Sequence, residues 1–162
     1  MLAKYHERLA DDFKLAWDSR RKWAKYLKKK YSEISTKLII ASEDGKVVGF
    51  MLCLLSPNVP IYKERKIGVI SDVFVNEERR RKGVMKKMFD MGIKWFRKNK
   101  VRTVQLSVAA ANTEAREIYA KMGFAPFMIH KRLDLADYQE SLSPSPRKIL
   151  RSKKHRRRKI LK

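Results

Sequence analysis

The sequence predicts an α/β fold in one domain, and three stretches carry this prediction. Residues 70 to 88 run from β-branched and aromatic residues through a basic loop into a helical pattern. Residues 106 to 124 repeat the order of strand, loop and short helix. Between residues 37 and 52, two apolar runs flank Asp44-Gly45, a dipeptide typical of hairpin turns. With 162 residues, 44% of them apolar, the chain is long enough to enclose a hydrophobic core.

Residues 5 to 30 are expected to form an amphipathic helix or a broken pair of helices that packs on the sheet. The apolar residues recur at helical spacings, and they are Leu9, Phe13, Ala16, Trp17, Ala24 and Leu27.

Residues 37 to 41 and 46 to 52 should form an antiparallel pair of strands. Residues 56 to 60, with two prolines, end the second strand, and residues 61 to 66 lead as a loop into the central strand. The single cysteine, Cys53, lies in the apolar run 47 to 55, so no intrachain disulfide can form and a buried, unreactive thiol is expected.

The loop after the central strand contains four consecutive cations, Arg79 to Lys82, followed by Gly83. A helix that starts here leaves its first amide groups unpaired, and these groups attract an anion such as phosphate. The expected helix places Val84, Met88, Met91 and Trp95 on its apolar face, with cations at its C-terminal end.

The second strand, loop and helix cover residues 101 to 123. Asn112 is a good N-cap for the helix, and Gly123 suits its C-terminal cap. The expected apolar stripe consists of Ala115, Ile118, Tyr119 and Met122. Alternating apolar residues, among them Phe127, Ile129 and Leu133, predict one or two last strands within residues 124 to 135.

Two motifs in this order resemble those of the GNAT family of acetyl-coenzyme A dependent N-acetyltransferases. They are a strand followed by Arg-x-x-Gly, residues 80 to 83, and Leu-x-Val-x-x-x-Asn, residues 106 to 112, with Ala, Tyr and Gly-Phe at set offsets. The resemblance covers residues 37 to 134. It implies a mixed, mostly antiparallel central sheet with helices on both faces and two strands that splay apart to form the cofactor cleft. Most members begin with a strand, whereas about four residues precede the first helical stretch here, so the first strand is short or missing.

The resemblance implies that acetyl-coenzyme A is the co-substrate. Its pyrophosphate would bind amide groups of the glycine loop, and its pantetheine arm would pair with the main chain of the central strand. The residues implied are Val73, Phe74, Val75, Arg80, Arg81, Lys82, Gly83, Val84, Met85, Lys86 and Asn112. Met85 stands where the family usually has Gly or Ala, so its side chain either narrows the loop or points into the core. Asn112 either contacts the cofactor arm or serves only as a helix cap.

Acetyl transfer needs a neutral amine, because an alkylammonium has no lone pair to attack a thioester. Some family members use a Glu as the base, but the matching position here is Ser107. Asp72 is therefore our candidate for amine contact or for base through water, and the alternative is an Asp that satisfies nearby amides. Tyr119 matches the tyrosine that resembling enzymes use as general acid, and the alternative is a core residue. Near the end of the first helical stretch, Tyr26, Tyr31 and Glu33 either line the acceptor site or belong to a packing helix.

The chain has a formal charge of +23, from 40 Lys and Arg against 17 Asp and Glu. We divide it into a catalytic domain, residues 1 to 140, and a basic tail, residues 141 to 162, with ten Lys or Arg and no acid. The tail is expected to be disordered, and it either keeps the protein soluble or binds nucleic acid or the ribosome.

No cluster of metal ligands and no membrane-spanning run occurs in the sequence, and a cytoplasmic protein is expected. A monomer and a homodimer are both open. Two functional hypotheses follow. The first is an enzyme that acetylates a primary amine, with the acceptor on a protein or peptide. The second is a polyanion-binding protein on a GNAT scaffold with weak or no catalysis.

Overall fold

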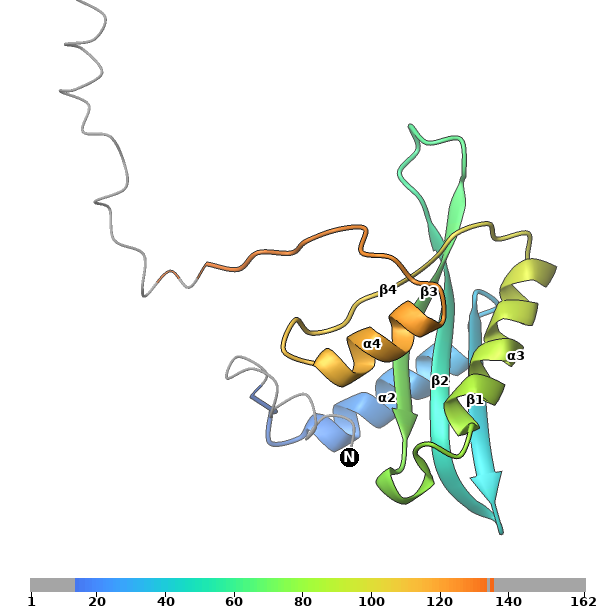
Figure 1. Ribbon diagram of the computed structural model, residues 1–162, viewed down its shortest axis with the longest axis vertical. Coiled ribbons are helices and arrows are strands. Elements are labelled where there is room, and N and C mark those ends of the chain that lie inside the picture. Colours follow the sequence, from blue (N-terminus) through green and yellow to red (C-terminus); the bar gives the residue numbers. More distant parts are fainter. Residues whose placement is uncertain (1–13, 134, 136–162) are drawn as a thin grey trace, which may run out of the picture. The chain divides into compact units, whose positions relative to one another are not determined.

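The computed structural model describes residues 14 to 133 and residue 135 (Figure 1). The chain divides into two compact units, residues 1 to 123 and residues 124 to 162. The predicted tail and the first part of the predicted N-terminal helix lie outside the described residues, so those two predictions are not addressed by the structure. The boundary predicted at residue 140 also lies outside them.

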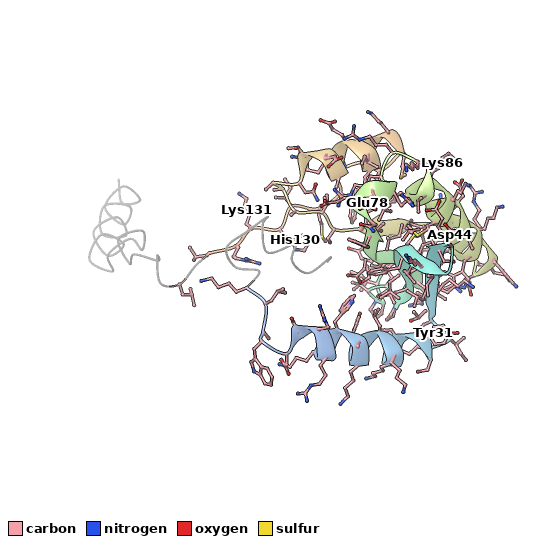
Figure 2. All side chains as sticks on the ribbon, turned by 90° about the horizontal axis from the view of Figure 1, so that it is seen from below. Tyr31, Asp44, Glu78, Lys86, His130 and Lys131 are labelled. Carbon is pink, nitrogen blue, oxygen red and sulfur yellow. The ribbon has the colours of Figure 1, made fainter. Side chains whose placement is uncertain are left out.

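The first unit holds one sheet and its helices. In chain order its elements are α2 (Ser19–Tyr31), β1 (Thr36–Glu43), β2 (Lys46–Pro57), β3 (Lys66–Val75), the 3-10 turn η1 (Glu77–Arg79), α3 (Val84–Lys98), β4 (Val104–Leu106) and α4 (Thr113–Lys121). The strand order is β1-β2-β3-β4, with β1, β2 and β3 antiparallel and β4 parallel to β3. In both views α2 lies on one side of the sheet, and α3 and α4 lie on the other (Figures 1 and 2). The predicted mixed α/β fold, mostly antiparallel and with helices on both faces, is confirmed.

The hairpin between β1 and β2 follows its sequence signal. Asp44 has a φ of 50° and Gly45 a φ of 73°. Two consecutive left-handed residues match the twist of the flanking strands, and Asp-Gly adopts this conformation readily. The register runs from Glu43 opposite Lys46 to Thr36 opposite Leu54. The predicted antiparallel pair is therefore confirmed.

The core lies where α3 crosses the sheet. Met51 and Cys53 are fully buried on β2, and burial raises the pKa of the Cys53 thiol to about 12. The thiol therefore stays protonated, as expected for a buried and unreactive cysteine. An added Cβ at Gly92 of α3 would lie 3.1 Å from the Cys53 sulfur and 3.4 Å from that of Met51, so this glycine lets helix and sheet approach closely.

The predicted apolar face of α3 is wrong at one position. Met91 is 54% exposed, whereas the buried residues of the helix are Met88, Gly92 and Phe96. The prediction relied on large apolar side chains and so placed the buried face one residue away from its true position. The residue closest to the sheet is Gly92, which has no side chain to signal it.

The start of α2 also differs from the prediction. Trp17 was assigned to an apolar stripe, but it precedes the helix and is 93% exposed. Ala16 is exposed as well, and α2 has no fully buried residue. Trp23 stacks on Tyr26 at 5.2 Å between ring centroids, and both are half-buried. The helix thus begins too late to place Ala16 and Trp17 on its packed side.

Residues 124 to 133 of the second unit contain no strand, so the predicted last strands are wrong there. Phe127, Ile129 and Leu133, which supplied the alternating pattern, are all largely exposed. Alternation favours a strand only where a neighbouring strand accepts its hydrogen bonds, and Pro126 has no amide to donate. None of the described helices is both long enough and apolar enough to cross a bilayer.

Replacing Gly68 by alanine should destabilise the fold. Its Cβ would lie 2.7 Å from two ring carbons of the buried Phe96, so we expect a loss of about 1 to 3 kcal/mol in the free energy of unfolding in urea. The double variant Gly68→Ala, Phe96→Leu should lose less than the sum of the two single variants, because the smaller side chain makes room. Strictly additive losses would show that this contact does not limit the packing.

Candidate functional site

Strands β3 and β4 pair over a short length and then part. The register matches Gly68 with Val104, Val69 with Gln105 and Ile70 with Leu106, and no later pair follows. β3 nevertheless continues to Val75, still paired with β2 on its other edge. Beyond Ile70, the β4-facing edge of β3 therefore has no strand partner among the described residues. This end of the pairing agrees with the parting of two strands that the resemblance to the GNAT family implied.

The register shows which main-chain groups lie on that open edge. The amide of Asn76 donates to the carbonyl of Val48 at 2.8 Å, so these two residues form a hydrogen-bonded pair. Such pairs alternate along antiparallel strands, and Phe74 opposite Phe50 is the next one. The main-chain groups of Val73 and Val75 consequently point away from β2. In agreement, the Arg80 Nε donates to the Val75 carbonyl at 3.4 Å.

A loop with two left-handed residues joins this strand to α3. Arg81 has a φ of 59° and Gly83 a φ of 77°, and a Cβ added at Gly83 would meet nothing within 4 Å. The amide of Lys87 donates to the Gly83 carbonyl at 3.1 Å, which is the first helical bond. The amides of Val84, Met85 and Lys86 precede it and have no helical acceptor. The loop thus offers amide donors, a helix dipole and open space to an anion.

The side chains of the loop divide into two groups. Arg79 is paired with Glu43, and Arg80 lies 3.8 Å from Glu77. Arg81 and Lys82 are exposed, and neither has a carboxylate within 4 Å in the described part of the chain. Val84 and Met85 are half-buried, while Lys86 is exposed and paired with Asp90 at 2.9 Å. The positive charge at the open side of the loop therefore comes mainly from Arg81 and Lys82.

α4 presents the second motif. The Asn112 side-chain oxygen accepts from the amide of Ala115 at 3.1 Å, which confirms the predicted cap. The four residues of the predicted stripe, Ala115, Ile118, Tyr119 and Met122, are all half-buried. Burial raises the pKa of the Tyr119 phenol. The hydroxyl therefore keeps its proton at neutral pH and can donate it.

Asp72 lies opposite Leu52, which places its side chain on the face of the sheet that Leu52 occupies. Met51, the neighbour of Leu52, packs toward α3, so Asp72 is on the other face, the side of α2. The Ser71 hydroxyl donates to Asp72 at 2.6 Å. Asp72 and Tyr119 thus come from elements on opposite sides of the sheet.

A groove of about 400 Å³ between α3 and α4 was not predicted. It is lined by Lys86, Phe89, Asp90, Ile118, Lys121 and Met122. Its cations stand on facing helices, and only the tertiary packing of α4 brings Lys121 to the loop side of α3. Within the described residues, no three His, Cys, Asp or Glu side chains cluster in a way that could hold a metal ion.

Comparison with known proteins gives a consistent result. The model of the acetyltransferase (GNAT) family matches residues 2 to 124. An uncharacterized N-acetyltransferase of Methanocaldococcus jannaschii is 29% identical over 106 residues, which are 65% of this chain and 46% of that protein. Another, of Archaeoglobus fulgidus, is 28% identical over 105 residues, 65% of this chain and 71% of that protein. The matched region thus spans about half of the first relative and about seven tenths of the second.

Solved structures share the fold. The tetramutant of a Bacillus halodurans protein superposes with a TM-score of 0.72 at 20% identity, covering 82% of this chain and 86% of that one. An aminoglycoside N-acetyltransferase in complex with CoA superposes with a TM-score of 0.60 at 20% identity, covering 73% of this chain and 90% of that one. At these identities the superpositions establish the fold alone.

The Tyr119 phenol should make stability fall at high pH. Because its pKa is raised in the folded state, the neutral form is favoured there, and stability is lost as pH rises from the ordinary tyrosine value of about 10 through the raised one. Urea unfolding at about pH 9 and about pH 11 should show a smaller loss for Tyr119→Phe than for the unchanged protein. Equal losses in both proteins would contradict the burial of this hydroxyl.

Proposed function

Because the chain belongs to the GNAT family of acetyltransferases, we propose that it transfers an acetyl group from acetyl-coenzyme A directly to a primary amine. The observation that carries this proposal is the loop of residues 79 to 86. It follows the stretch of β3 from Ser71 to Val75, which has no β4 partner, and it ends in a helix whose first amide groups have no helical acceptor. An open strand edge and an anion site are thus contiguous along one stretch of chain, as a ligand with an extended arm and a pyrophosphate requires.

The residues present fit such a ligand. The amides of Val84, Met85 and Lys86 donate hydrogen bonds to the pyrophosphate, with Arg81 and Lys82 adding positive charge. Gly83 allows close approach, because nothing in the protein occupies the position of a Cβ there. When bound, acetyl-coenzyme A supplies an acyl thioester for transfer.

The open edge of β3 holds the arm of the ligand. Val73 and Val75 point their main-chain groups to that side, and Phe74, whose main chain faces β2, keeps the strand in register. Asn112 closes the α4 end of the site, with its amide oxygen already engaged in the cap. The groove between α3 and α4 extends the site past Lys86, and its two lysines suit a further phosphate.

The chemistry is divided between the two faces of the sheet. Asp72, on the face of α2, contacts the amine and takes its proton directly or through water. The nitrogen then forms its bond to the acyl carbon as the carbon–sulfur bond breaks. Tyr119, on α4, donates its proton to the departing thiolate, since its buried phenol is neutral. The amine therefore approaches from one side and the thiol leaves toward the other.

The acceptor that we propose is an amine on a protein or peptide. Structural neighbours include aminoglycoside N-acetyltransferases, and aminoglycosides are small polycations. A chain with a formal charge of +23 repels such substrates over long range. A single amine on a larger molecule is not repelled in this way when acidic groups surround it. A cytoplasmic location remains part of the proposal.

One observation favours a second candidate, a polyanion-binding protein on the same scaffold. Ser107 occupies the position where some relatives carry a basic Glu, and it is exposed on the segment after β4. A serine cannot accept the amine proton at neutral pH, so catalysis depends on Asp72 or on water. The charge of the chain would then be its main functional property.

Calorimetric titration of acetyl-coenzyme A into the full chain tests the first proposal. We expect saturable one-to-one binding, much tighter than that of ATP, and about tenfold weaker binding for Gly83→Ala, whose Cβ would enter the anion site. Gly45→Ala is the matched control, since Gly45 has a φ of 73° and equally open surroundings but lies in the β1–β2 turn. It should bind as the unchanged protein does. Binding no tighter than that of ATP would overturn the assignment and favour the second candidate.

Tyr119→Phe tests the general acid. We expect kcat to fall roughly a hundredfold with an amine acceptor, while the dissociation constant of acetyl-coenzyme A stays within about twofold. Calorimetry and steady-state kinetics on the same preparation separate the two effects. Full turnover across the pH range by this variant would remove Tyr119 from the mechanism.

A further inference from the structure

Helix α2 carries an unusual charge that the acetyltransferase chemistry does not use. Between Ser19 and Tyr31 it contains seven Lys or Arg and no acid. Three of the cations stand in its last turn, where the helix dipole favours them, but the other four are spread over the earlier turns. The helix dipole alone therefore does not account for the pattern.

The cations gather on one side of the helix. At 100° per residue, a sector of about 200° contains Arg20, Arg21, Lys22, Lys25, Lys28 and Lys29, and all six are exposed. The remaining sector holds Trp23, Tyr26, Leu27 and Lys30, which are half-buried. Figure 2 shows the nitrogen-tipped side chains of α2 pointing away from the sheet. The helix thus presents an almost purely cationic surface to its surroundings.

Most of this charge has no partner within the described residues. Arg21 and Lys22 share the carboxylate of Asp18, at 3.3 and 2.9 Å. Arg20, Lys25, Lys28 and Lys29 have no carboxylate within 4 Å in residues 14 to 133. These four extend over nine residue steps, or about 13 Å along the helix axis.

We propose that this surface of α2 binds the phosphodiester backbone of a nucleic acid, through Arg20, Lys25, Lys28 and Lys29. The four cations lie within about 180° of the helix surface and about 13 Å of its length, so they contact several phosphates of one polyanion at once. Tyr31, 73% exposed and about 20° around the helix from Arg20, adds a hydroxyl and an aromatic face on the same side. Contacts to phosphate carry no sequence information, so we expect binding through these four cations to be independent of sequence.

An anionic membrane fits this surface less well. Helices that bind bilayers insert an apolar face below their charged residues. The apolar side chains of α2, Trp23 and Leu27, are half-buried against the protein, and its exposed sector offers only Ala24 and Tyr31 besides the cations. For the helix itself, contact with a bilayer would therefore rest on charge, and an apolar anchor would have to come from flanking residues such as Trp17, which is 93% exposed.

The surface is also separate from the cofactor loop. α2 lies on one side of the sheet, whereas α3, whose first turn forms the loop, lies on the other (Figure 2). Binding at α2 therefore goes beyond the proposed acetyl transfer and does not rest on it.

The test compares two variants of the full chain that lose equal charge. The first is R20Q/K25Q/K28Q/K29Q. The control is K94Q/R97Q/K98Q/K100Q, which likewise removes one Arg and three Lys, all exposed, from the end of α3 and the residues after it. Affinity for labelled RNA and DNA duplexes of arbitrary sequence is measured by fluorescence anisotropy over a range of salt concentrations. Because both variants lose four positive charges, long-range attraction to the nucleic acid falls equally in both, and residues 141 to 162 contribute equally to both. A difference between the variants therefore reports direct contact by α2.

We expect the slope of log K against log salt to become shallower by about 3.6 in the α2 variant and by less than about 1 in the control, because each of the four cations that contacts duplex phosphate contributes roughly 0.9. The variant R20K/K25R/K28R/K29R, which keeps all four positive charges, should have the same slope as the unchanged protein. Acetyl-coenzyme A binding should be unchanged in all of them. Equal slopes for the α2 variant and the control, with thermal unfolding unchanged, would overturn the proposal.

Two further probes, phosphatidylserine vesicles and polyglutamate, test whether the α2 surface binds a membrane or an acidic protein instead. A loss of binding to phosphatidylserine vesicles, with duplex binding intact, would overturn the proposal in favour of a membrane surface. Competition by polyglutamate as effective as by duplex, at equal charge concentration, would overturn it in favour of an acidic protein. We expect polyglutamate to compete more weakly, because its charges are not fixed on a stiff backbone.

Discussion

The parting of β3 from β4 is the constraint on which the rest of the site depends. β3 can continue beyond Ile70 without β4 because its other edge stays paired with β2 as far as Gly49 opposite Val75. Its open main-chain groups therefore need a partner from solvent or ligand, since unpaired polar groups are costly where water is excluded. The register shift between Leu52 and Cys53 leaves Ser71 without a partner on β2, and beyond it Val73 and Val75 turn their main chain to the open side. The strand is thereby prepared to bind an extended ligand without losing its place in the sheet.

The loop is held at this edge by close packing on the face that α3 covers. Three glycines make this possible. Gly92 brings α3 onto Cys53, Gly68 accommodates the ring of Phe96, and a Cβ at Gly49 would meet the Phe74 carbonyl at 2.8 Å. Because these positions have no side chains, α3 packs close to the sheet, and its first turn lies near the end of β3. The position of the proposed anion site therefore depends on core packing as much as on its own basic residues.

Local signals in the sequence predicted local structure well. Asp44-Gly45 forms the expected turn, Asn112 forms the expected cap, and the strand–loop–helix order around Gly83 holds. Features that depend on distant partners were harder to predict. Trp17 is exposed because α2 starts after it, and Met91 is exposed because α3 packs on the sheet through Gly92. Residues 124 to 133 have an alternating apolar pattern but form no strand, since no described strand pairs with them. For the candidate site, the sequence identified the loop, but the opposite faces of Asp72 and Tyr119 and the groove at Lys121 follow only from register and tertiary packing.

The positive charge of the molecule is divided between surfaces that serve different purposes. In the loop, Arg81 and Lys82 stand beside amide groups that we propose as donors to an anion, so their charge adds to a directional site. On α2, Arg20, Lys25, Lys28 and Lys29 are long and exposed and have no carboxylate within 4 Å among the described residues, which suits a polymer that can be held in many registers. Since the two surfaces lie on opposite sides of the sheet, a polyanion on α2 does not cover the loop. Asp72 lies on the α2 side as well, so in our proposal the acceptor amine approaches the sheet from the side on which the polyanion is held.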